Sequence, residues 1–332
     1  MTDKNVNIYQ ELLHTPEGVR DYYGEENARK QHVSQAVLSR MHLFGYQDLQ
    51  TPTFEFFDVF SREIGTTPSR DLYKFFDNDG NTLCLRSDFT PSVYADAEMI
   101  ALLIECLQQA GLSRFQISIG NVEYFKGACQ AFGLDHETEM TLRDYISGKN
   151  FFAAEDLLKN LGLNREQRDQ FLRITDFMDD KNALEAVREV TGNERSREAI
   201  SRLIDLYNVI EAYGYGEYVS FDLTLLSKYH YYTGVIFKGY TYGTGEAVAT
   251  GGRYDNLLLH FGKEAAAIGF MIQIDAVMEA IQRQRIRIPL TARIVEIRYT
   301  AQNYQESLKK AIQLRREGIR CVLIPEEDKE GK

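Results

Sequence analysis

The apolar residues of the first half of the chain recur with both helical and strand-like spacing. Between residues 28 and 44 they return every three or four positions, which predicts an amphipathic helix ended by Gly45. Segment 46–56 predicts a strand with Pro52 at an edge or irregularity. The runs LYKFFD and NTLCLRSD flank Asn78-Asp79-Gly80 and predict a β-hairpin, because Asp-Gly accepts the positive φ of a tight turn. The remaining elements predicted before residue 150 are a helix at 91–111 and a strand at 115–122.

A purely helical pattern occupies residues 151–213. Asn164 followed by Gln167 is typical of a helix N-cap with a capping box, and Gly192-Asn193 separates the next two helices. An apolar stripe at helical spacing runs through Ile200, Leu203, Ile204, Tyr207 and Ile210. We therefore expect a helical insertion here.

Strand patterns return after Gly216. The segments EYVSFDLTLL, HYYTGVIFKGYTY and EAVATGG each predict a strand, and an amphipathic helix is expected at 275–283. The last 42 residues predict a strand, a helix ended by Gly318 and another strand, a unit too small to bury a core alone. Hairpins on either side of a helical block predict an α+β fold with a mostly antiparallel sheet. The predicted domains are a core at 1–150 and 214–290, a helical insertion at 151–213, and a truncated β-α-β segment at 291–332.

Composition narrows the function classes. The 332 residues include 38 Lys and Arg against 49 Asp and Glu, and this net charge of −11 disfavours a nucleic-acid-binding surface. No apolar run approaches the ~20 residues that span a membrane, and the N-terminus is polar, so we expect a cytoplasmic protein without a membrane partner. Scattered cysteines predict buried free thiols rather than disulfides or a zinc site; they are Cys84, Cys106, Cys129 and Cys321.

The sequence lacks the standard catalytic and cofactor motifs. Its six histidines form neither HExxH nor His-x-His, and it has no GxSxG elbow or Walker loop. His136-Glu137-Thr138-Glu139 comes nearest to a metal cluster, but a solvated acidic loop is the preferred interpretation. Gly243-Thr244-Gly245 is not followed by a helical pattern, so a hairpin turn is preferred over a dinucleotide site. We therefore expect no catalytic residue, no metal and no cofactor.

Several ordered motifs are more specific. They are PEGVRD at 16–21, TPTFE at 51–55, LRSDFTP at 85–91, HYYTG at 230–234, ATGGRYDNLL at 249–258 and IGF at 268–270. In order and spacing they resemble the catalytic core of histidyl-tRNA synthetase, a class II aminoacyl-tRNA synthetase, over roughly residues 10–290. The resemblance implies a mostly antiparallel sheet flanked by helices. PEGVRD, with the acidic-x-Thr-Pro pattern after Leu-Arg, resembles in particular the regulatory subunit of ATP phosphoribosyltransferase, a catalytically inactive paralogue.

The resemblance implies a retained amino-acid pocket. Its candidate histidine-binding residues are Asp88, Thr90, Tyr232, Gly251, Gly252 and Tyr254. The first two occupy positions that meet the α-amino group, the tyrosines flank the imidazole, and the glycines let backbone approach the ligand. Three alternatives stay open: Asp88 as a helix N-cap, 251–253 as a turn with a surface ion pair, and Tyr231-Tyr232 as strand core.

The resemblance also implies a two-fold interface built by the first class II motif. The helix at 28–44 and the strand through Pro52 correspond to that motif, and an apolar stripe on the helix would otherwise be exposed. The candidate dimer-interface residues are Val33, Val37, Met41 and Pro52.

Three departures from the synthetase pattern argue against catalysis. Class II activation uses arginines on the phosphates, but Tyr124 or its neighbour, Ser227 and Ala276 occupy the expected positions. Negative charge that develops during adenylyl transfer would then lack its preorganised cations. Because losing one such donor typically costs about 100- to 1000-fold in rate, losing three should abolish the reaction.

Three functions follow as hypotheses. The first is a non-enzymatic regulatory subunit that binds L-histidine and the short-form ATP phosphoribosyltransferase catalytic subunit, as a homodimer within a hetero-octamer. It would confer activation and feedback inhibition on the first step of histidine biosynthesis. The second is a histidyl-tRNA synthetase-type aminoacylating enzyme, and the third a general amino-acid-sensing module with another partner. Since one β-α-β unit follows the core on an acidic chain, we expect no tRNA partner.

Overall fold

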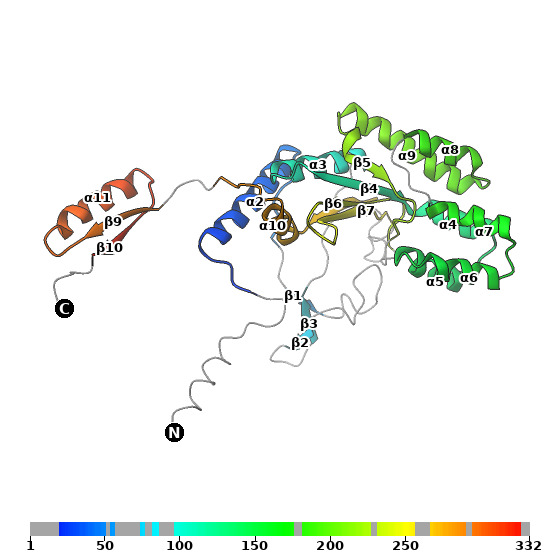
Figure 1. Cartoon of the computed structure of the whole chain (residues 1–332), viewed down its shortest axis with the longest axis horizontal. Coiled ribbons are helices and arrows are strands. Elements are labelled where there is room, and N and C mark those ends of the chain that lie inside the picture. Colours follow the sequence, from blue (N-terminus) through cyan, green and yellow to red (C-terminus); the bar gives the residue numbers. More distant parts are fainter. Residues whose placement is uncertain are drawn as a thin grey trace, which may run out of the picture. The chain divides into compact units, whose positions relative to one another are not determined.

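The computed structural model describes residues 20–50, 54–56, 74–76, 82–85, 96–175, 181–226, 231–255, 266–289 and 294–326 (Figure 1). The chain divides into two compact units. One extends from Val33 to Ile286, and the other combines the first 32 residues with Arg287–Lys332. No helix in the described ranges is long and apolar enough to cross a membrane.

A five-stranded sheet forms the centre of the larger unit, with the strand order β5-β4-β6-β7-β8. Its strands are β4 (Phe115–Asn121), β5 (Val219–Phe221), β6 (Val235–Thr241), β7 (Ala249–Arg253) and β8 (Ile268–Ile272). The β4–β5 pair is parallel and the other three pairs are antiparallel, which confirms the predicted α+β architecture. Side chains alternate between the two faces of the sheet. One face is apolar, and Ile117, Ile119 and Phe237 are fully buried on it.

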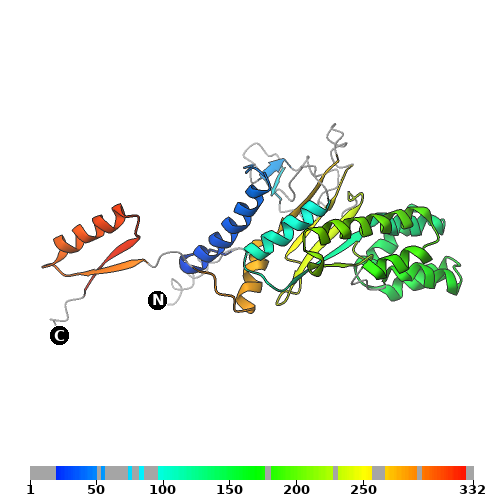
Figure 2. The same cartoon turned by 90° about the horizontal axis from the view of Figure 1, so that it is seen from above.

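Two helices cover this apolar face (Figures 1 and 2). They are α3 (Asp96–Gln109), which contacts β8, and α9 (Glu194–Ala212), which contacts β4 and α3. Helix α3 confirms the helix predicted at 91–111, and α10 (Ile274–Arg283) follows β8 as expected. Most of α3 is buried because its sequence DAEMIALLIECLQQ is apolar around nearly its whole circumference.

The first predicted helix is α2 (Gly24–Leu43), and Gly45 follows it with a φ of +85°. Val33 and Val37 are only 1% and 4% exposed, and Met41 is half-buried. The expectation of an exposed apolar stripe is therefore wrong for Val33 and Val37, because the chain buries them itself. Pro52 lies outside the described residues.

The helical block begins at residue 122 rather than at 151. Its helices are α4 (Val122–Ala131), α5 (His136–Ser147), α6 (Phe151–Asn160), α7 (Arg165–Leu172), α8 (Lys181–Val190) and α9. The Asp135 carboxylate accepts a hydrogen bond from the Thr138 N–H at 2.9 Å and caps α5. The acidic-loop interpretation of residues 136–139 is thus wrong: they form the first turn of a helix, where acidic side chains are favourable. The boundary between core and insertion stays a prediction.

Local signals within the block are confirmed. The Gln167 N–H donates to Asn164 Oδ1 at 3.0 Å, and the Asn164 N–H donates to Gln167 Oε1 at 2.9 Å, which completes the predicted capping box. Asn193 caps α9 through the Ser196 N–H at 2.8 Å. Helices α4 and α9 approach closely at Gly127, where a Cβ would lie 2.5 Å from Ser196 Oγ. The predicted stripe of α9 is buried at Ile200, Leu203, Ile204 and Ile210.

A small antiparallel sheet has the order β1-β3-β2, with β1 (Phe54–Phe56), β2 (Lys74–Phe76) and β3 (Thr82–Leu85). Pairing of Phe76 with Thr82 confirms the predicted hairpin. The strand predicted at 46–56 is wrong over 46–50, which are not in a strand. There the Tyr46 N–H donates back to the Met41 carbonyl at 3.2 Å and closes the end of α2.

The C-terminal segment forms the predicted β-α-β unit. It consists of β9 (Val295–Tyr299), α11 (Tyr304–Arg316) and β10 (Cys321–Pro325), and the two strands are parallel. Gly318 has a φ of +76° just after α11, which explains why the helix ends there.

Cys106 and Cys129, which we call the two buried thiols, are free, as is the half-buried Cys321. Burial raises the pKa of both buried thiols to about 12. They contribute as small apolar side chains rather than as reactive groups. In the part of the chain that the structure describes, no group of three His, Cys, Asp or Glu side chains is arranged to hold a metal ion.

Candidate functional site

Three tyrosines, Tyr231, Tyr232 and Tyr254, gather where β6 begins and β7 ends; we call them the tyrosine cluster. The ring centroids of Tyr231 and Tyr232 lie 4.5 Å apart, and the Tyr231 and Tyr254 rings meet at 90° with centroids 5.8 Å apart. Tyr231 and Tyr232 precede β6, so the strand-core interpretation is wrong. The Thr233 N–H donates to the Arg253 carbonyl at 2.8 Å and ties this turn to the end of β7.

The two predicted pocket glycines lie in β7 rather than in a turn. A Cβ on Gly252 would lie 2.6 Å from the Tyr232 ring, and one on Gly251 would lie 2.5 Å from the Phe237 ring. Only glycine fits at either position, since the protein's own aromatic rings take the space on both faces of the strand. Gly252 thereby lets the tyrosine cluster lie directly on the sheet.

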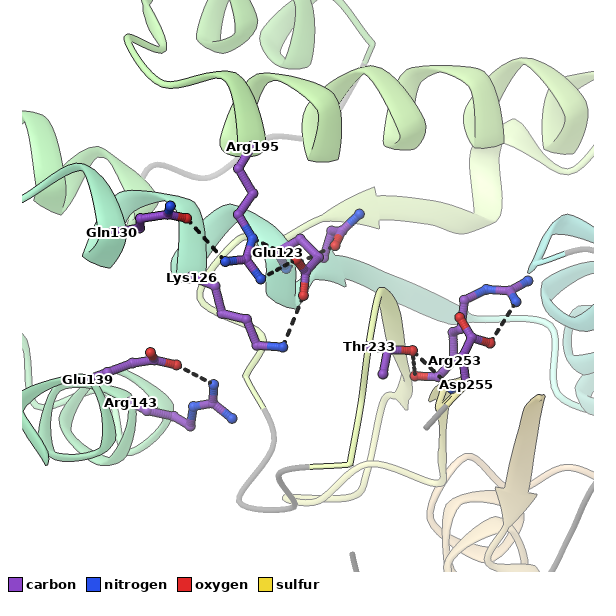
Figure 3. Close-up of polar contacts among 10 residues, drawn as sticks. Glu123, Lys126, Gln130, Glu139, Arg143, Arg195, Thr233, Arg253 and Asp255 are labelled. Carbon is purple, nitrogen blue, oxygen red and sulfur yellow. Dashed lines mark hydrogen bonds and ion pairs between the residues drawn. The ribbon is translucent and has the colours of Figure 1, made fainter. Parts of the chain in front are cut away.

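Arg253 joins the site to two other elements. Its Nε and Nη2 lie 2.9 and 2.7 Å from Asp96 Oδ1 at the start of α3. Its Nη1 donates to Asp255 Oδ1 at 3.1 Å (Figure 3). The Asp255 N–H donates to Thr233 Oγ1 at 3.0 Å. Arg202 of α9 reaches the other Asp96 oxygen at 2.9 Å. Because the Arg253 side chain is only 14% exposed, the surface-ion-pair alternative is wrong.

The structure brings together three of the six predicted pocket residues, namely Tyr232, Gly252 and Tyr254, whereas Gly251 faces Phe237 on the other side of β7. Asp88 and Thr90 lie outside the described residues. Sequence reasoning missed Tyr231, although its neighbour was chosen, and Asp96. The Tyr-Tyr doublet could have indicated Tyr231. Asp96 gave no such signal, because an acidic residue at the start of a helix is common.

A second polar group lies on the helical block (Figure 3). Glu123 of α4 accepts from Lys126 Nζ at 3.0 Å and pairs with Arg195 Nη2 of α9 at 2.6 Å, while Arg195 Nη1 donates to Gln130 Oε1 at 3.3 Å. Partial burial opposes ionisation of Glu123, but these two cations outweigh it and lower the pKa of the carboxyl group. These contacts fasten α4 to α9.

Sequence relatives decide the family. The histidyl-tRNA synthetase family model matches residues 18–94 and 92–277. An ATP phosphoribosyltransferase regulatory subunit from Acetivibrio thermocellus is 30% identical over 92% of this chain and 85% of its own. The corresponding protein of Caldanaerobacter subterraneus is 31% identical over 92% and 93%. The chain belongs to the histidyl-tRNA synthetase-like ATP phosphoribosyltransferase regulatory subunits.

Solved structures agree with this assignment to the regulatory subunits. A Bacillus halodurans protein described as an ATP phosphoribosyltransferase regulatory subunit/histidyl-tRNA synthetase has a TM-score of 0.83 at 28% identity, over 96% of this chain and 94% of its own. Histidyl-tRNA synthetase from Nostoc has a TM-score of 0.78 at 17% identity, over 96% and 87%, and shows the shared fold. The predicted fold class and family are confirmed, together with a regulatory, non-catalytic subunit.

The match to the family is interrupted before α3. The two matched pieces meet at residues 92–94. The Acetivibrio alignment covers 357 positions, whereas 92% of this chain is about 305 residues (0.92 × 332), which leaves about 52 positions (357 − 305) without a counterpart here. The aligned part of this relative is therefore longer than the part of this chain that it matches.

The structure corrects one of the three departures from the synthetase. Tyr124 was expected on the second-motif strand, but β4 ends at Asn121 and Tyr124 lies buried in α4. Asn121 ends the strand because its side chain accepts from the Glu123 N–H and caps the helix. Tyr124 therefore says nothing about a missing arginine. Ala276 lies in the first turn of α10, after β8, and Ser227 is outside the described residues.

Proposed function

We propose that this regulatory subunit binds a catalytic ATP phosphoribosyltransferase chain, activates it, and transmits feedback inhibition by L-histidine. The tyrosine cluster carries the proposal, because the faces of aromatic side chains suit a flat heteroaromatic ring such as imidazole. The names of the regulatory-subunit relatives support the partner. Feedback requires that histidine bind two states of the complex with different affinity.

The direct test is an activity assay with and without this chain. A short-form catalytic subunit is assayed alone, then with the regulatory subunit, and then with added histidine. We expect the regulatory subunit to raise the activity and histidine to lower it. A catalytic subunit whose activity does not respond to this chain would contradict the proposal.

We propose that histidine lies against Tyr232 and Tyr254, with its α-ammonium group on Asp88 and Thr90. A charge-assisted hydrogen bond is worth roughly 1.5–3 kcal/mol, so Asp88→Ala should weaken histidine binding by about 10- to 100-fold. Tyr232→Ala should also weaken it, and neither change should dissociate the complex. Calorimetry measures both, with the exposed Tyr213→Ala as control. Unchanged affinity in Asp88→Ala would show that this pocket does not hold the ligand.

Two other functions make different predictions. An aminoacylating enzyme would exchange pyrophosphate with ATP in the presence of histidine, and we expect no exchange above background. An amino-acid-sensing module with another partner would be favoured if a pull-down recovered no phosphoribosyltransferase.

The assembly is also part of the proposal. We propose a homodimer within a hetero-octamer, on the resemblance of α2 and the following strand to the first class II motif. Leu43 and Leu49, beyond the buried face of α2, are 75% and 78% exposed and suit such an interface. Light scattering at micromolar concentration tests it, and a monomeric mass would refute the dimer.

A further inference from the structure

An open groove of about 430 Å³ lies where β4 begins and β6 ends. Its lining residues are Arg114, Phe115, Gln116, Tyr240, Thr241 and Tyr242. Gln116 and Tyr240 are register partners, so their side chains share one face of the sheet. Tyr240 and Tyr242 are 40% and 75% exposed, whereas Phe115 is buried and stacks on Tyr218 with ring centroids 5.0 Å apart. The groove therefore presents two large aromatic side chains to solvent on a packed base.

Hydrogen bonds hold both sides of the groove in place. Thr241 Oγ1 donates to the Arg114 carbonyl at 2.6 Å and joins the start of β4 to the end of β6. Gln284 Nε2, just after α10, donates to Thr241 Oγ1 at 3.0 Å and to the Tyr242 carbonyl at 2.6 Å. Because this backbone is already fixed, a partner that binds here pays little to order it.

The rim of the groove is positively charged, although the chain carries a net charge of −11. Arg114 is exposed, as is Arg285, which follows Gln284 in the chain, and neither takes part in an ion pair within the described ranges. Two carboxylates act on Tyr240, those of Asp222 and Glu246, and Lys149 pairs with Asp222 at 3.1 Å. The two arginines thus outnumber the remaining carboxylate, that of Glu246.

This chemistry fits a protein partner better than other ligands. Tyrosine and arginine are the residues enriched at the energetic centres of protein interfaces. A groove this open would leave most of a small molecule in water. A two-fold contact with a second copy would set the same arginines against each other, and an acidic chain repels nucleic acid.

We propose that this groove binds the catalytic ATP phosphoribosyltransferase chain, through an apolar segment that carries a carboxylate. The assignment rests on the proposed function and identifies where its partner docks. The carboxylate pairs with Arg114, and the apolar side chains of the segment pack against Tyr240 and Tyr242.

The test is calorimetric titration of the full chain into a short-form catalytic subunit. Tyr242→Ala and Arg114→Glu should each weaken the association by about 10- to 100-fold, as expected for residues at the centre of an interface. Arg114→Glu should also reduce the dependence of the affinity on salt concentration. The controls are Phe152→Ala, which removes an aromatic side chain that is 82% exposed, and Arg173→Glu, which reverses an exposed charge after α7.

Circular dichroism and the urea midpoint establish that each variant is folded. Unchanged association in both groove variants, or equal weakening by the controls, would overturn this docking surface while the proposed function stands. Loss of the homodimer in Arg114→Glu would assign the groove to a second copy, and an RNA bound by the wild type but not by Arg114→Glu would assign it to nucleic acid; either result overturns the proposal. A wild-type chain that does not bind the catalytic subunit would overturn both the docking surface and the proposed function.

Discussion

Replacing either of the two arginines that contact Asp96 should destabilise the fold to very different extents. Both guanidinium groups lie within 2.9 Å of the same carboxylate, which is 7% exposed. Arg253 is 14% exposed, whereas Arg202 is 54% exposed. The two variants thus share one partner and differ mainly in burial, which isolates the effect of solvent on an ion pair.

The magnitudes follow from that difference. Breaking a buried pair typically costs about 3–5 kcal/mol, because the remaining charge stays desolvated. For Arg253→Met we expect the lower end, about 3 kcal/mol, since Asp96 keeps Arg202. An exposed pair contributes about 0–1 kcal/mol, so Arg202→Met should cost no more than that. Asp96→Asn should resemble Arg253→Met, because it leaves Arg253 with Asp255 alone.

Urea unfolding monitored by circular dichroism measures these costs as changes in midpoint at constant m-value. A changed m-value would indicate an altered denatured or native state rather than a lost contact. Arg202→Met as costly as Arg253→Met, or costlier, would refute the reasoning from burial. Because Arg253 also precedes Tyr254 and ties Asp255 to Thr233, only Arg253→Met should disturb the tyrosine cluster, visible as a change in tyrosine near-UV circular dichroism.

Three further predictions concern the helical block and the thiols. Glu123→Gln should destabilise the protein at pH 7, and the difference from the wild type should shrink as the pH falls below the unfolded carboxyl pKa. The lowered pKa of Glu123 contributes stability above the unfolded pKa, and this stability is lost as the pH falls through the folded one. Urea midpoints measured from pH 7 down into the acid range test this convergence. Gly127→Ala should lower the free energy of unfolding by about 1–3 kcal/mol, because the added Cβ would lie 2.8 Å from the Ser196 backbone nitrogen. Gly245→Ala is the control: no atom lies within 4 Å of the added Cβ, so we expect no change in the same unfolding assay. The two buried thiols should resist alkylation by iodoacetamide at pH 8 until the protein unfolds, because burial raises their pKa to about 12. Mass spectrometry of the native protein after treatment measures this, and modified Cys106 or Cys129 would contradict it.

Elements with a local chemical signal were predictable from the sequence. The capping box at Asn164 and Gln167 satisfies helix-terminal donors with groups three residues apart, so no tertiary information is needed. The same holds for the glycine after each of α2 and α11, whose positive φ is a property of the residue itself. The order and spacing of the sequence motifs predicted the family, and the family in turn predicted the fold.

Features decided by tertiary contact were not predictable in the same way. Val122 begins a helix because Asn121 caps it, yet the apolar run through that point continues the pattern of β4. Val33 and Val37 form a stripe that fits equally well in an interface or in the chain's own core, and the structure shows the second. Arg253 follows two glycines and suggested a turn, but Asp96, distant in sequence, holds it inside the fold.

The ion pairs of the chain bear on the expected loss of adenylyl transfer. The ion pairs around the sheet and the helical block include Arg253–Asp96, Arg202–Asp96, Lys126–Glu123, Arg195–Glu123 and Arg143–Glu139. A site for adenylyl transfer needs several preorganised cations directed at phosphate oxygens, but each of these cations already faces a carboxylate of the chain. The cations of these pairs are therefore engaged within the chain, in line with its place among the regulatory subunits.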